Sequence, residues 1–294
     1  MHKYGETFRD LRLEKGYTLK QLAKDIMSVS FLSKFERGES DISLYYFAKL
    51  LDRLAISYDE FFHIHYGEKL ENFETILERA ERAFAERDIE TIRSLRKQQY
   101  NKWKKEQMDQ YLCHTVMLDI YESILSNKLI DSEEEAIKTL YEYLFKVEVW
   151  RNYELRLYHS TMLAMPLEMV IILSKTAYER SLTNNTLRDT KKLLTSVLIN
   201  TLIYLTGGMG SFERETEVEQ FLTYIEKIGI DELDLYPRNS LLQVKGIYEI
   251  RKGNVEEGVE RVKKASTIAT QLGSHKLAAQ IDNYLEIVLE KGRS

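Results

Sequence analysis

The sequence is poor in residues that cross-link or interrupt a chain. Among 294 residues it has one cysteine, Cys113, and two prolines, Pro166 and Pro237. A single cysteine excludes a disulfide within the chain and fits a reducing compartment. Because prolines are rare while Leu, Glu, Lys and Tyr are abundant, the composition favours long helices and short turns over sheets. We therefore expect an all-α protein.

Long apolar runs are also lacking. The most apolar stretch, from Met165 to Ser174, is too short to span a bilayer, and Met1 leads directly into charged sequence without the features of a signal peptide. These absences predict a cytoplasmic protein with no membrane partner.

The length of the chain is typical of two domains. The net charge of −5 argues against non-specific nucleic-acid binding by the whole molecule.

Signatures of catalysis are absent as well. The sequence contains no glycine-rich phosphate loop with a flanking strand and lysine. Its histidines, cysteine and acidic residues do not show the spacing of a metal site. We therefore expect neither an enzyme nor a bound cofactor or metal.

What the sequence does contain is a basic N-terminal region. Residues 1–38 hold eight Lys and Arg against five Asp and Glu, a local charge of +3. The stretch SFLSKFERGESDIS, from Ser30 to Ser43, predicts a short helix that stops at Gly38. Leu32 and Phe35 share its apolar face. Its polar side is therefore free to meet something outside the protein.

The first 66 residues read as five short helices. Thr18 is a natural N-cap with Gln21 three residues later, which is the capping-box pattern. Ser28 is a candidate N-cap for the next helix, which runs to about Arg37. Apolar periodicity places the remaining helices around residues 8–15, 44–54 and from 59 onward. Two helices joined by a tight turn, the second of them polar on its outer side, define a helix-turn-helix.

This region resembles known DNA-binding regulators. TLKQLAKDIMSVSFLSKFERGES is similar to the helix-turn-helix of lambdoid phage repressors and of the XRE regulator family, with Leu22-Ala23 and Glu36-Arg37-Gly38 as its most specific marks. More narrowly, FRDLRLEKGYTLKQLA and SVSFLSKFERGESDIS, followed by a long helical region, resemble the Rgg/GadR/MutR family. That resemblance implies a cytoplasmic regulator of Gram-positive bacteria, related to peptide-sensing regulators with tetratricopeptide-like C-terminal domains.

The resemblance also implies which residues contact DNA. In the resembled fold, the N-terminus of the second helix of the motif enters the major groove. The start of the preceding helix lies on the phosphate backbone, where free amides and the helix dipole favour anions. Solvated charges are the alternative interpretation, which the agreement of spacing, caps and charge disfavours. The implied DNA-binding set is Val29, Ser30, Ser33 and Lys34 toward bases, Thr18, Lys20 and Gln21 toward phosphates, and Ser28, Arg9 and Arg37 as further contacts.

Two other positions in the motif are informative. Arg12 and Glu36 occupy places that resemble a repressor salt bridge between the first helix and the recognition helix, so we expect a structural ion pair there. One departure from the family pattern concerns the turn between the two motif helices. It is one residue shorter than in many members, and Met27 stands where glycine is common.

Residues 67–294 read as a succession of helices. Near the end, a helix, a Gly-Asn turn and a second helix place Gly246, Gly253, Gly258 and Ala265 at positions that resemble tetratricopeptide spacing. Stacked helix pairs form a curved α-solenoid whose concave groove suits extended peptides. We therefore expect a regulatory and dimerisation domain built as an α-solenoid. The segments with helical periodicity are 71–88, 89–106, 110–128, 132–150, 152–181, 185–208, 215–230, 241–274 and 275–291.

Polar side chains in otherwise apolar helices are the candidates for binding a short hydrophobic peptide. In VWRNYELRLY, which ends at Tyr158, an arginine can clamp a peptide carboxylate and an asparagine can pair with a peptide amide. A second polar pair stands at i and i+4 in the segment 185–208. Each residue also has an ordinary interpretation, as a surface arginine or a structural asparagine. The candidate peptide-binding residues are Arg151, Asn152, Tyr158, Asn200 and Tyr204.

Two further features each allow two interpretations. The stretch 93–105 carries Arg93, Arg96, Lys97, Lys102, Lys104 and Lys105 with no acid between them. We interpret it as a solvated helix face balanced by acidic neighbours, rather than as a contact with flanking DNA. The last helical segment has an apolar stripe that either caps the solenoid or forms a dimer contact. The stripe consists of Leu277, Ile281, Leu285, Val288 and Leu289.

The leading hypothesis is a homodimeric transcription regulator that binds promoter DNA at paired half-sites and senses a short peptide. One alternative is a helical-repeat interaction scaffold whose N-terminal module docks proteins instead of DNA. Another is a dimeric repressor without a ligand. The basic balance of residues 1–38 disfavours the scaffold, and salt-dependent binding to promoter DNA discriminates between the readings.

Overall fold

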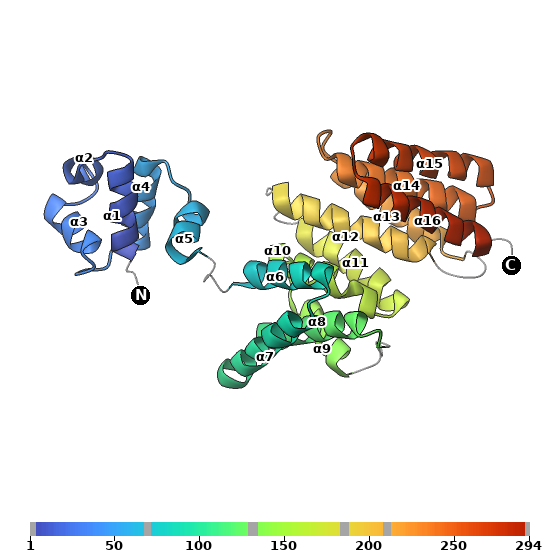
Figure 1. The fold of residues 1–294 in the computed structure, drawn as a ribbon, viewed down its shortest axis with the longest axis horizontal. Coiled ribbons are helices and arrows are strands. Elements are labelled where there is room, and N and C mark those ends of the chain that lie inside the picture. Colours follow the sequence, from blue (N-terminus) through green and yellow to red (C-terminus); the bar gives the residue numbers. More distant parts are fainter. Residues whose placement is uncertain (1–3, 68–71, 129–134, 183–187, 208–212, 292–294) are drawn as a thin grey trace. The chain divides into compact units, whose positions relative to one another are not determined.

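The computed structural model describes residues 4–67, 72–128, 135–182, 188–207 and 213–291, and within these ranges every regular element is a helix (Figure 1). The prediction of an all-α fold is thereby confirmed. The chain divides into two compact units, residues 1–79 and 80–294. The boundary between them falls inside helix α6 (Phe73–Glu86). The domain boundary expected after residue 66 stays a prediction.

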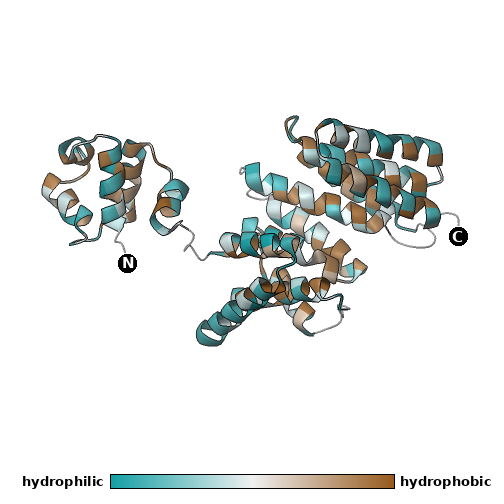
Figure 2. Ribbon diagram, viewed as in Figure 1, coloured by the Kyte–Doolittle hydropathy of each residue, from teal (hydrophilic) through white to brown (hydrophobic). Residues whose placement is uncertain are grey.

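The N-terminal unit folds its first helices around one apolar core. Phe8, Leu22, Leu32, Leu50 and Phe61 are fully buried in it. Each comes from a different helix, so the core joins all five, and Figure 2 shows apolar and polar residues alternating along them. The helices are α1 (Tyr4–Glu14), α2 (Leu19–Ala23), α3 (Val29–Glu36), α4 (Leu44–Leu54) and α5 (Tyr58–Tyr66).

Helix α5 is tied to α1 by polar contacts as well as by the core. The hydroxyl of Thr7 lies 2.7 Å from Nδ1 of His65, and the hydroxyls of Tyr4 and Tyr66 are hydrogen-bonded. That bond raises the pKa of Tyr4. Sequence periodicity gave no sign of these contacts, because they join residues about sixty positions apart.

The C-terminal unit contains the end of α6 and the helices that follow it. Most agree with the expected segments within a few residues, but α14 begins at Leu235, ahead of the start expected at 241. The expected helix starts at 132 and 185 lie outside the described residues. The elements are α7 (Ile89–Glu106), α8 (Asp109–Leu125), α9 (Glu135–Lys146), α10 (Asn152–Thr161), the 3-10 helix η2 (Met162–Ala164), α11 (Leu167–Leu182), α12 (Arg188–Thr206), α13 (Glu215–Ile228), α14 (Leu235–Arg251), α15 (Val255–Gln271) and α16 (His275–Lys291).

One expected helical segment is interrupted. Residues 152–181 form α10, η2 and α11 instead of one helix. Pro166 causes the break, because proline disfavours a helical conformation at the residue before it. Met165 is accordingly extended, with φ −98° and ψ 151°. The break changes the direction of the chain, and Leu163 beside it is 68% exposed.

Helices α14 and α15 pack closely because two glycines face each other. A Cβ on Gly246 would lie 2.8 Å from the carbonyl oxygen of Gly258, and a Cβ on Gly258 would lie 2.5 Å from that of Gly246. Gly253, in the turn between these helices, has φ +97°, which favours glycine. Ala265 is fully buried in the same core. The glycine and alanine spacing seen in the sequence therefore marks a close antiparallel helix pair.

The last helix covers this pair. In α16, Ile281, Leu285 and Val288 are buried against residues of α14 and α15, with Leu277 and Leu289 partly buried. Figure 1 shows the three helices beside one another. The apolar stripe of α16 thus caps the helix pair within one chain, and a role in dimer contacts stays a prediction.

Candidate nucleic-acid interface and ligand pocket

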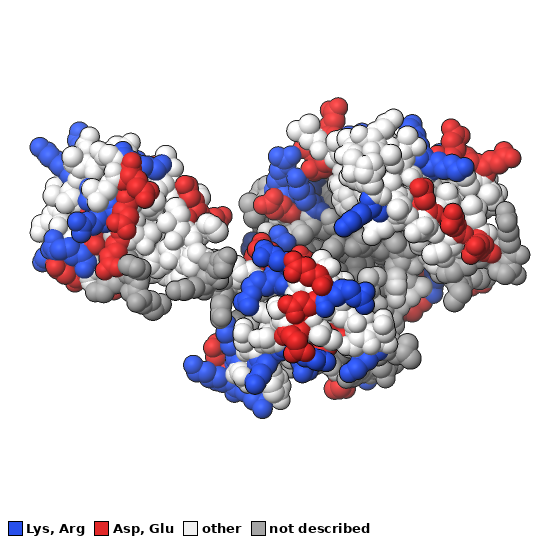
Figure 3. Space-filling model, viewed as in Figure 1, with Lys and Arg blue, Asp and Glu red and all other residues white. Residues whose placement is uncertain are grey.

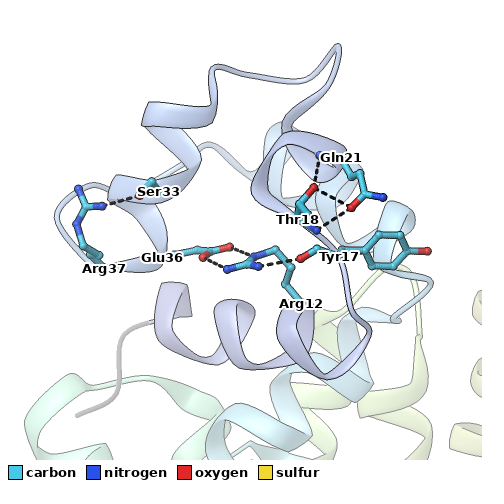
Figure 4. A network of polar contacts seen from close by, with 7 residues as sticks. All are labelled: Arg12, Tyr17, Thr18, Gln21, Ser33, Glu36 and Arg37. Carbon is cyan, nitrogen blue, oxygen red and sulfur yellow. Dashed lines mark hydrogen bonds and ion pairs between the residues drawn. The ribbon is translucent and has the colours of Figure 1, made fainter.

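Side-chain caps define the beginning of both motif helices. The hydroxyl of Thr18 accepts a hydrogen bond from the backbone N–H of Gln21 at 3.2 Å, and the side-chain oxygen of Gln21 accepts from the backbone N–H of Thr18 at 2.8 Å (Figure 4). This reciprocal pair is the capping box. Ser28 caps α3 in the same way, by accepting from the N–H of Phe31 at 3.2 Å. Both helices therefore begin where the sequence predicts.

The short turn between α2 and α3 is built without glycine. Asp25 adopts the left-handed conformation with φ +58°, which aspartate tolerates better than most residues. Met27 packs against the core of the unit. The end of α2 is capped by Arg53 of α4, whose guanidinium donates to the carbonyl oxygens of Leu22 at 2.9 Å, Gln21 and Lys24. Arg53 was not found from the sequence, since its partners lie about thirty residues away.

A buried ion pair fixes α3 against α1. Nε and Nη2 of Arg12 donate to the two carboxylate oxygens of Glu36, each at 2.7 Å (Figure 4). A third donor, Nη1, reaches the carbonyl oxygen of Tyr17 at 2.8 Å. The hydrogen bonds to Glu36 raise the pKa of Arg12. Neither side chain is available to DNA, so the pair serves to orient α3.

The outer face of α3 is open to solvent. Val29 is 43% exposed, and Ser30 and Lys34 are exposed as well, while Ser33 is half-buried. Lys20 and Gln21 are exposed at the start of α2. Figure 3 shows Lys and Arg side chains gathered over the part of this unit that α2 and α3 occupy, with acidic side chains along α1. This face has the surface and the charge that a major-groove contact requires.

Arg37 is already engaged at the end of α3. Its guanidinium binds the carboxylate of Glu39 through Nε at 2.6 Å and Nη2 at 2.8 Å. Nη1 donates to the hydroxyl of Ser33 at 2.5 Å (Figure 4). The bonds to Glu39 raise the pKa of Arg37. A phosphate contact by Arg37 would therefore have to compete with Glu39. Arg9, on α1, is exposed.

The basic stretch in α7 is partly neutralised within its own unit. Arg93 binds Glu122 of α8 and Glu90, each at 2.8 Å. Arg96 binds Asp119 of α8 at 2.6 Å. These pairs agree with the interpretation of a balanced helix face, although the partners on α8 are not the acidic neighbours expected from the sequence.

The C-terminal unit contains a pocket of about 560 Å³ between η2, α11, α12 and α16. This volume lies in the range of ligand sites in proteins. Leu163 stands 68% exposed at its rim. The described residues that line the pocket are mainly apolar: Leu163, Leu167, Asn200, Ile203, Tyr204, Gly207 and Tyr284.

Asn200 and Tyr204, predicted as an i, i+4 polar pair, both line this pocket. The amide nitrogen of Asn200 donates to Nε2 of His159 at 3.0 Å. Burial and the nearby Arg156 lower the pKa of His159, which favours the neutral ring that this bond needs. Tyr204 donates its hydroxyl to the carbonyl oxygen of Met165 at 3.2 Å. The two side chains are thus held in place beside an apolar surface.

The other predicted peptide contacts lie elsewhere. Tyr158 is fully buried, and its hydroxyl donates to the carbonyl oxygen of Val170 at 2.9 Å. The prediction that it faces a ligand is therefore wrong, because its ring fills the core. Arg151 is exposed before the first residue of α10, and its backbone N–H donates to Glu154. Asn152 accepts from Thr190 at 2.6 Å. The structure does not bring Arg151 or Asn152 into the described lining of the pocket.

Two kinds of feature are absent from the described residues. No group of three or more His, Cys, Asp or Glu side chains in these ranges is arranged to hold a metal ion. Among the described helices, none combines the length and apolar content that crossing a bilayer requires.

Solved structures resemble this chain over nearly its whole length. The SHP pheromone receptor Rgg2 of Streptococcus dysgalactiae is 27% identical, with a TM-score of 0.80 over 97% of this chain and 99% of that one. The PrgX/iCF10 complex is 18% identical, with a TM-score of 0.75 over 100% and 98%. A bacterial peptide pheromone/receptor complex is 17% identical, with a TM-score of 0.73 over 99% and 100%. Because the last two structures share only 18% and 17% identity with this chain, their likeness to it concerns the fold alone.

Family matches cover both units. Residues 8–61 match a helix-turn-helix family, which agrees with the capped motif of α2 and α3. Residues 92–283 match the family described as HTH-type transcriptional regulator Rgg, C-terminal domain. This second match covers well over half of the chain. The chain belongs to the Rgg family of helix-turn-helix transcriptional regulators.

Proposed function

We propose that this protein regulates transcription by binding promoter DNA through α3, under the control of a short apolar peptide held in the pocket between α11, α12 and α16. The observation that carries the proposal is the presence of Asn200 and Tyr204, two oriented polar side chains, in a mainly apolar pocket. A few placed polar groups on an apolar surface are typical of ligand sites. Two of the structural relatives are named as pheromone receptors.

DNA recognition is assigned to exposed residues of α3 and the start of α2. Val29 offers an apolar contact to a thymine methyl, and Lys34 offers a donor to guanine. Lys20, at the start of α2, meets the phosphate backbone together with the capped end of that helix. Ser30 and Gln21 complete the exposed set.

The peptide backbone needs hydrogen-bond partners wherever the pocket shields it from water. The amide nitrogen of Asn200 donates one of its two N–H groups to His159, and its side-chain oxygen accepts an N–H from the ligand. Apolar ligand side chains rest on Leu163, Leu167 and Ile203. Arg151 remains a candidate partner for a ligand carboxylate, outside the described pocket lining.

The regulator acts as a cytoplasmic homodimer in this proposal. A single module with one recognition helix contacts few base pairs, so paired half-sites and a second copy supply the missing specificity. A peptide controls such a dimer only if it binds one arrangement of the protomers better than another.

The test combines DNA and peptide binding on the full-length protein. Duplexes are selected from a random library, and labelled apolar heptapeptides are titrated by fluorescence anisotropy. Asn200→Ala should weaken peptide binding at least about tenfold, while Ser196→Ala, on α12 but outside the described lining, should not. Addition of peptide should change the affinity for the selected DNA. Failure of all peptides alongside intact DNA binding leaves a ligand-independent repressor.

An interaction scaffold is the second candidate, since the C-terminal unit is built from packed helix pairs. The exposed basic face of α2 and α3 favours DNA instead. Affinity for duplex DNA that falls steeply with salt concentration would support regulation. Affinity that is absent at low salt would favour the scaffold.

A further inference from the structure

The last helix contributes one side chain to the described lining of the pocket. Tyr284 is the residue through which α16 enters the described lining. Its hydroxyl donates to the carbonyl oxygen of Ile203 at 3.4 Å, which is a long and weak bond. The same carbonyl accepts the backbone N–H of Gly207 at 3.0 Å. The hydroxyl of Tyr284 is also hydrogen-bonded to the side chain of Thr206. The ring of Tyr284 is thus held against the end of α12 by contacts of its hydroxyl.

The position of that ring depends on Gly207 having no side chain. A Cβ at this residue would lie 2.7 Å from the hydroxyl oxygen of Tyr284, which is closer than such contacts occur. The next atom of the tyrosine, Cζ, would lie at 3.7 Å, an ordinary contact distance. The Cβ would also lie 3.0 Å from the carbonyl oxygen of Ile203, which is a tight contact. The hydroxyl of Tyr284 is the closest atom to a side chain at Gly207, and an alanine there would have to displace it.

We propose that Gly207 and Tyr284 act as a matched pair that sets the end wall of the pocket and so determines which ligand side chain fits. The side chain selected is uncharged and aliphatic, because it rests on Leu163, Leu167 and Ile203 and meets the tyrosine ring at its far end. We expect this wall to leave less room for a larger aromatic group. The inference rests on the proposed function, in which the pocket binds a peptide.

The selectivity of an apolar pocket is sensitive to small changes in its walls. One methylene group more or less changes binding by about 10–200-fold. Removing the ring in Tyr284→Ala should therefore shift the preference from leucine toward tryptophan by at least about tenfold. Tyr284→Phe keeps the ring and loses the contacts of the hydroxyl with Ile203 and Thr206. It should retain the preference of the wild-type protein.

The matched pair makes a stronger prediction through a double variant. Gly207→Ala alone should weaken binding of the leucine peptide at least about tenfold, because the ring is pushed out of place. Adding Tyr284→Phe removes the colliding oxygen. The double variant Gly207→Ala/Tyr284→Phe should therefore bind within about threefold of Tyr284→Phe alone, a non-additivity expected of residues in contact.

The experiment uses the full-length protein and labelled apolar heptapeptides. The tightest wild-type binder is resynthesised with Leu, Phe or Trp at each position and titrated against all four variants, whose folding is checked by circular dichroism. Shifted preference in Tyr284→Ala together with rescue in the double variant supports the matched pair. The inference is overturned if Tyr284→Ala ranks the peptides as the wild type does and the double variant does not recover binding. In that case the proposed function still stands, because the peptides bind. If no peptide binds the wild type, both are rejected.

Discussion

The guanidinium of Arg12 and the carboxylate of Glu36 meet through two hydrogen bonds of 2.7 Å across 24 residues of sequence. The two residues are only 7% and 3% exposed. The pair joins α1 to the helix assigned to base recognition, and a third bond from Arg12 to Tyr17 extends the contact to the loop before α2. The orientation of the proposed DNA-reading face therefore depends on a buried charge pair in the core.

Removal of Glu36 should destabilise the protein strongly. In Glu36→Ala, the Arg12 charge stays buried without its carboxylate, and breaking such a pair costs about 3–5 kcal/mol. The matched control is Glu39→Ala, which breaks the exposed Arg37–Glu39 pair and should lower the stability far less. Urea denaturation of both variants measures the difference in the free energy of unfolding. Equal midpoints would mean that the Arg12 pair contributes no more than a surface contact.

Two lysines should affect DNA binding in different ways. Lys34→Ala removes a proposed base contact and should cost about 1–3 kcal/mol on the selected duplex, with relaxed specificity. Lys20→Ala removes a proposed phosphate contact. It should therefore make the slope of log K against log salt concentration less steep by about one. Lys263→Ala, exposed on α15, is the control and should change neither quantity. Gel-shift titrations over a range of salt give both values. Unchanged binding by Lys34→Ala would remove it from the interface.

The sequence predicted the local structure of the N-terminal unit well, because its signals are local. Thr18 and Ser28 cap the helices that follow them, as their hydroxyls and spacing indicate. The capping by Arg53 and the conformation of Asp25 were not predictable in this way. The capping depends on how α4 packs against α2, and a propensity or a spacing rule does not carry that information. The left-handed conformation of Asp25 is one that few non-glycine residues adopt.

The candidate ligand pocket was predictable only in part. Asn200 and Tyr204 were found because two polar residues at i and i+4 stand out in an apolar helix. Tyr158 was wrongly predicted because tyrosine occurs both in hydrated grooves and in protein cores. Here its hydroxyl is hydrogen-bonded to Val170 and Ser174 inside the protein. Tyr284 lies some eighty residues from Asn200, so no local pattern could place it in the pocket.

The close contact of α14 and α15 makes a further prediction. A Cβ on Gly246 would lie 2.7 Å from a methyl carbon of Val262 and 2.8 Å from the carbonyl oxygen of Gly258. Because the latter is backbone, the helices must separate, and Gly246→Ala should cost about 1–3 kcal/mol of unfolding free energy. The control Ser240→Ala lies on the same helix and should change stability by no more than about 0.5 kcal/mol. Urea denaturation tests this, and a neutral Gly246→Ala would contradict the close packing.

The buried ring of His114 should make the stability of the C-terminal unit depend on pH. His114 is 3% exposed. Its Nδ1 lies 3.1 Å from the side-chain oxygen of Gln99, and its Nε2 lies 3.1 Å from the hydroxyl of Tyr153. Burial, assisted by the charge of Lys102, lowers the pKa of His114 to about 4. The folded protein therefore keeps this ring neutral at pH values where an unfolded chain would protonate it.

The sign of the effect follows from which state binds the proton. An unfolded histidine titrates near pH 6.5, so between about pH 6.5 and 4 the unfolded chain binds more protons than the folded one, and stability falls as the pH falls. The stability is fully present above pH 6.5, and the loss due to this residue is complete below about pH 4, where it amounts to roughly 3 kcal/mol. Urea denaturation at several pH values should show a shallower dependence in His114→Gln than in the wild type, whatever the starting stability of the variant. His275→Gln, exposed at the start of α16, is the matched control and should follow the wild type. Equal pH dependence in His114→Gln and the wild type would show that the buried ring is not the group responsible.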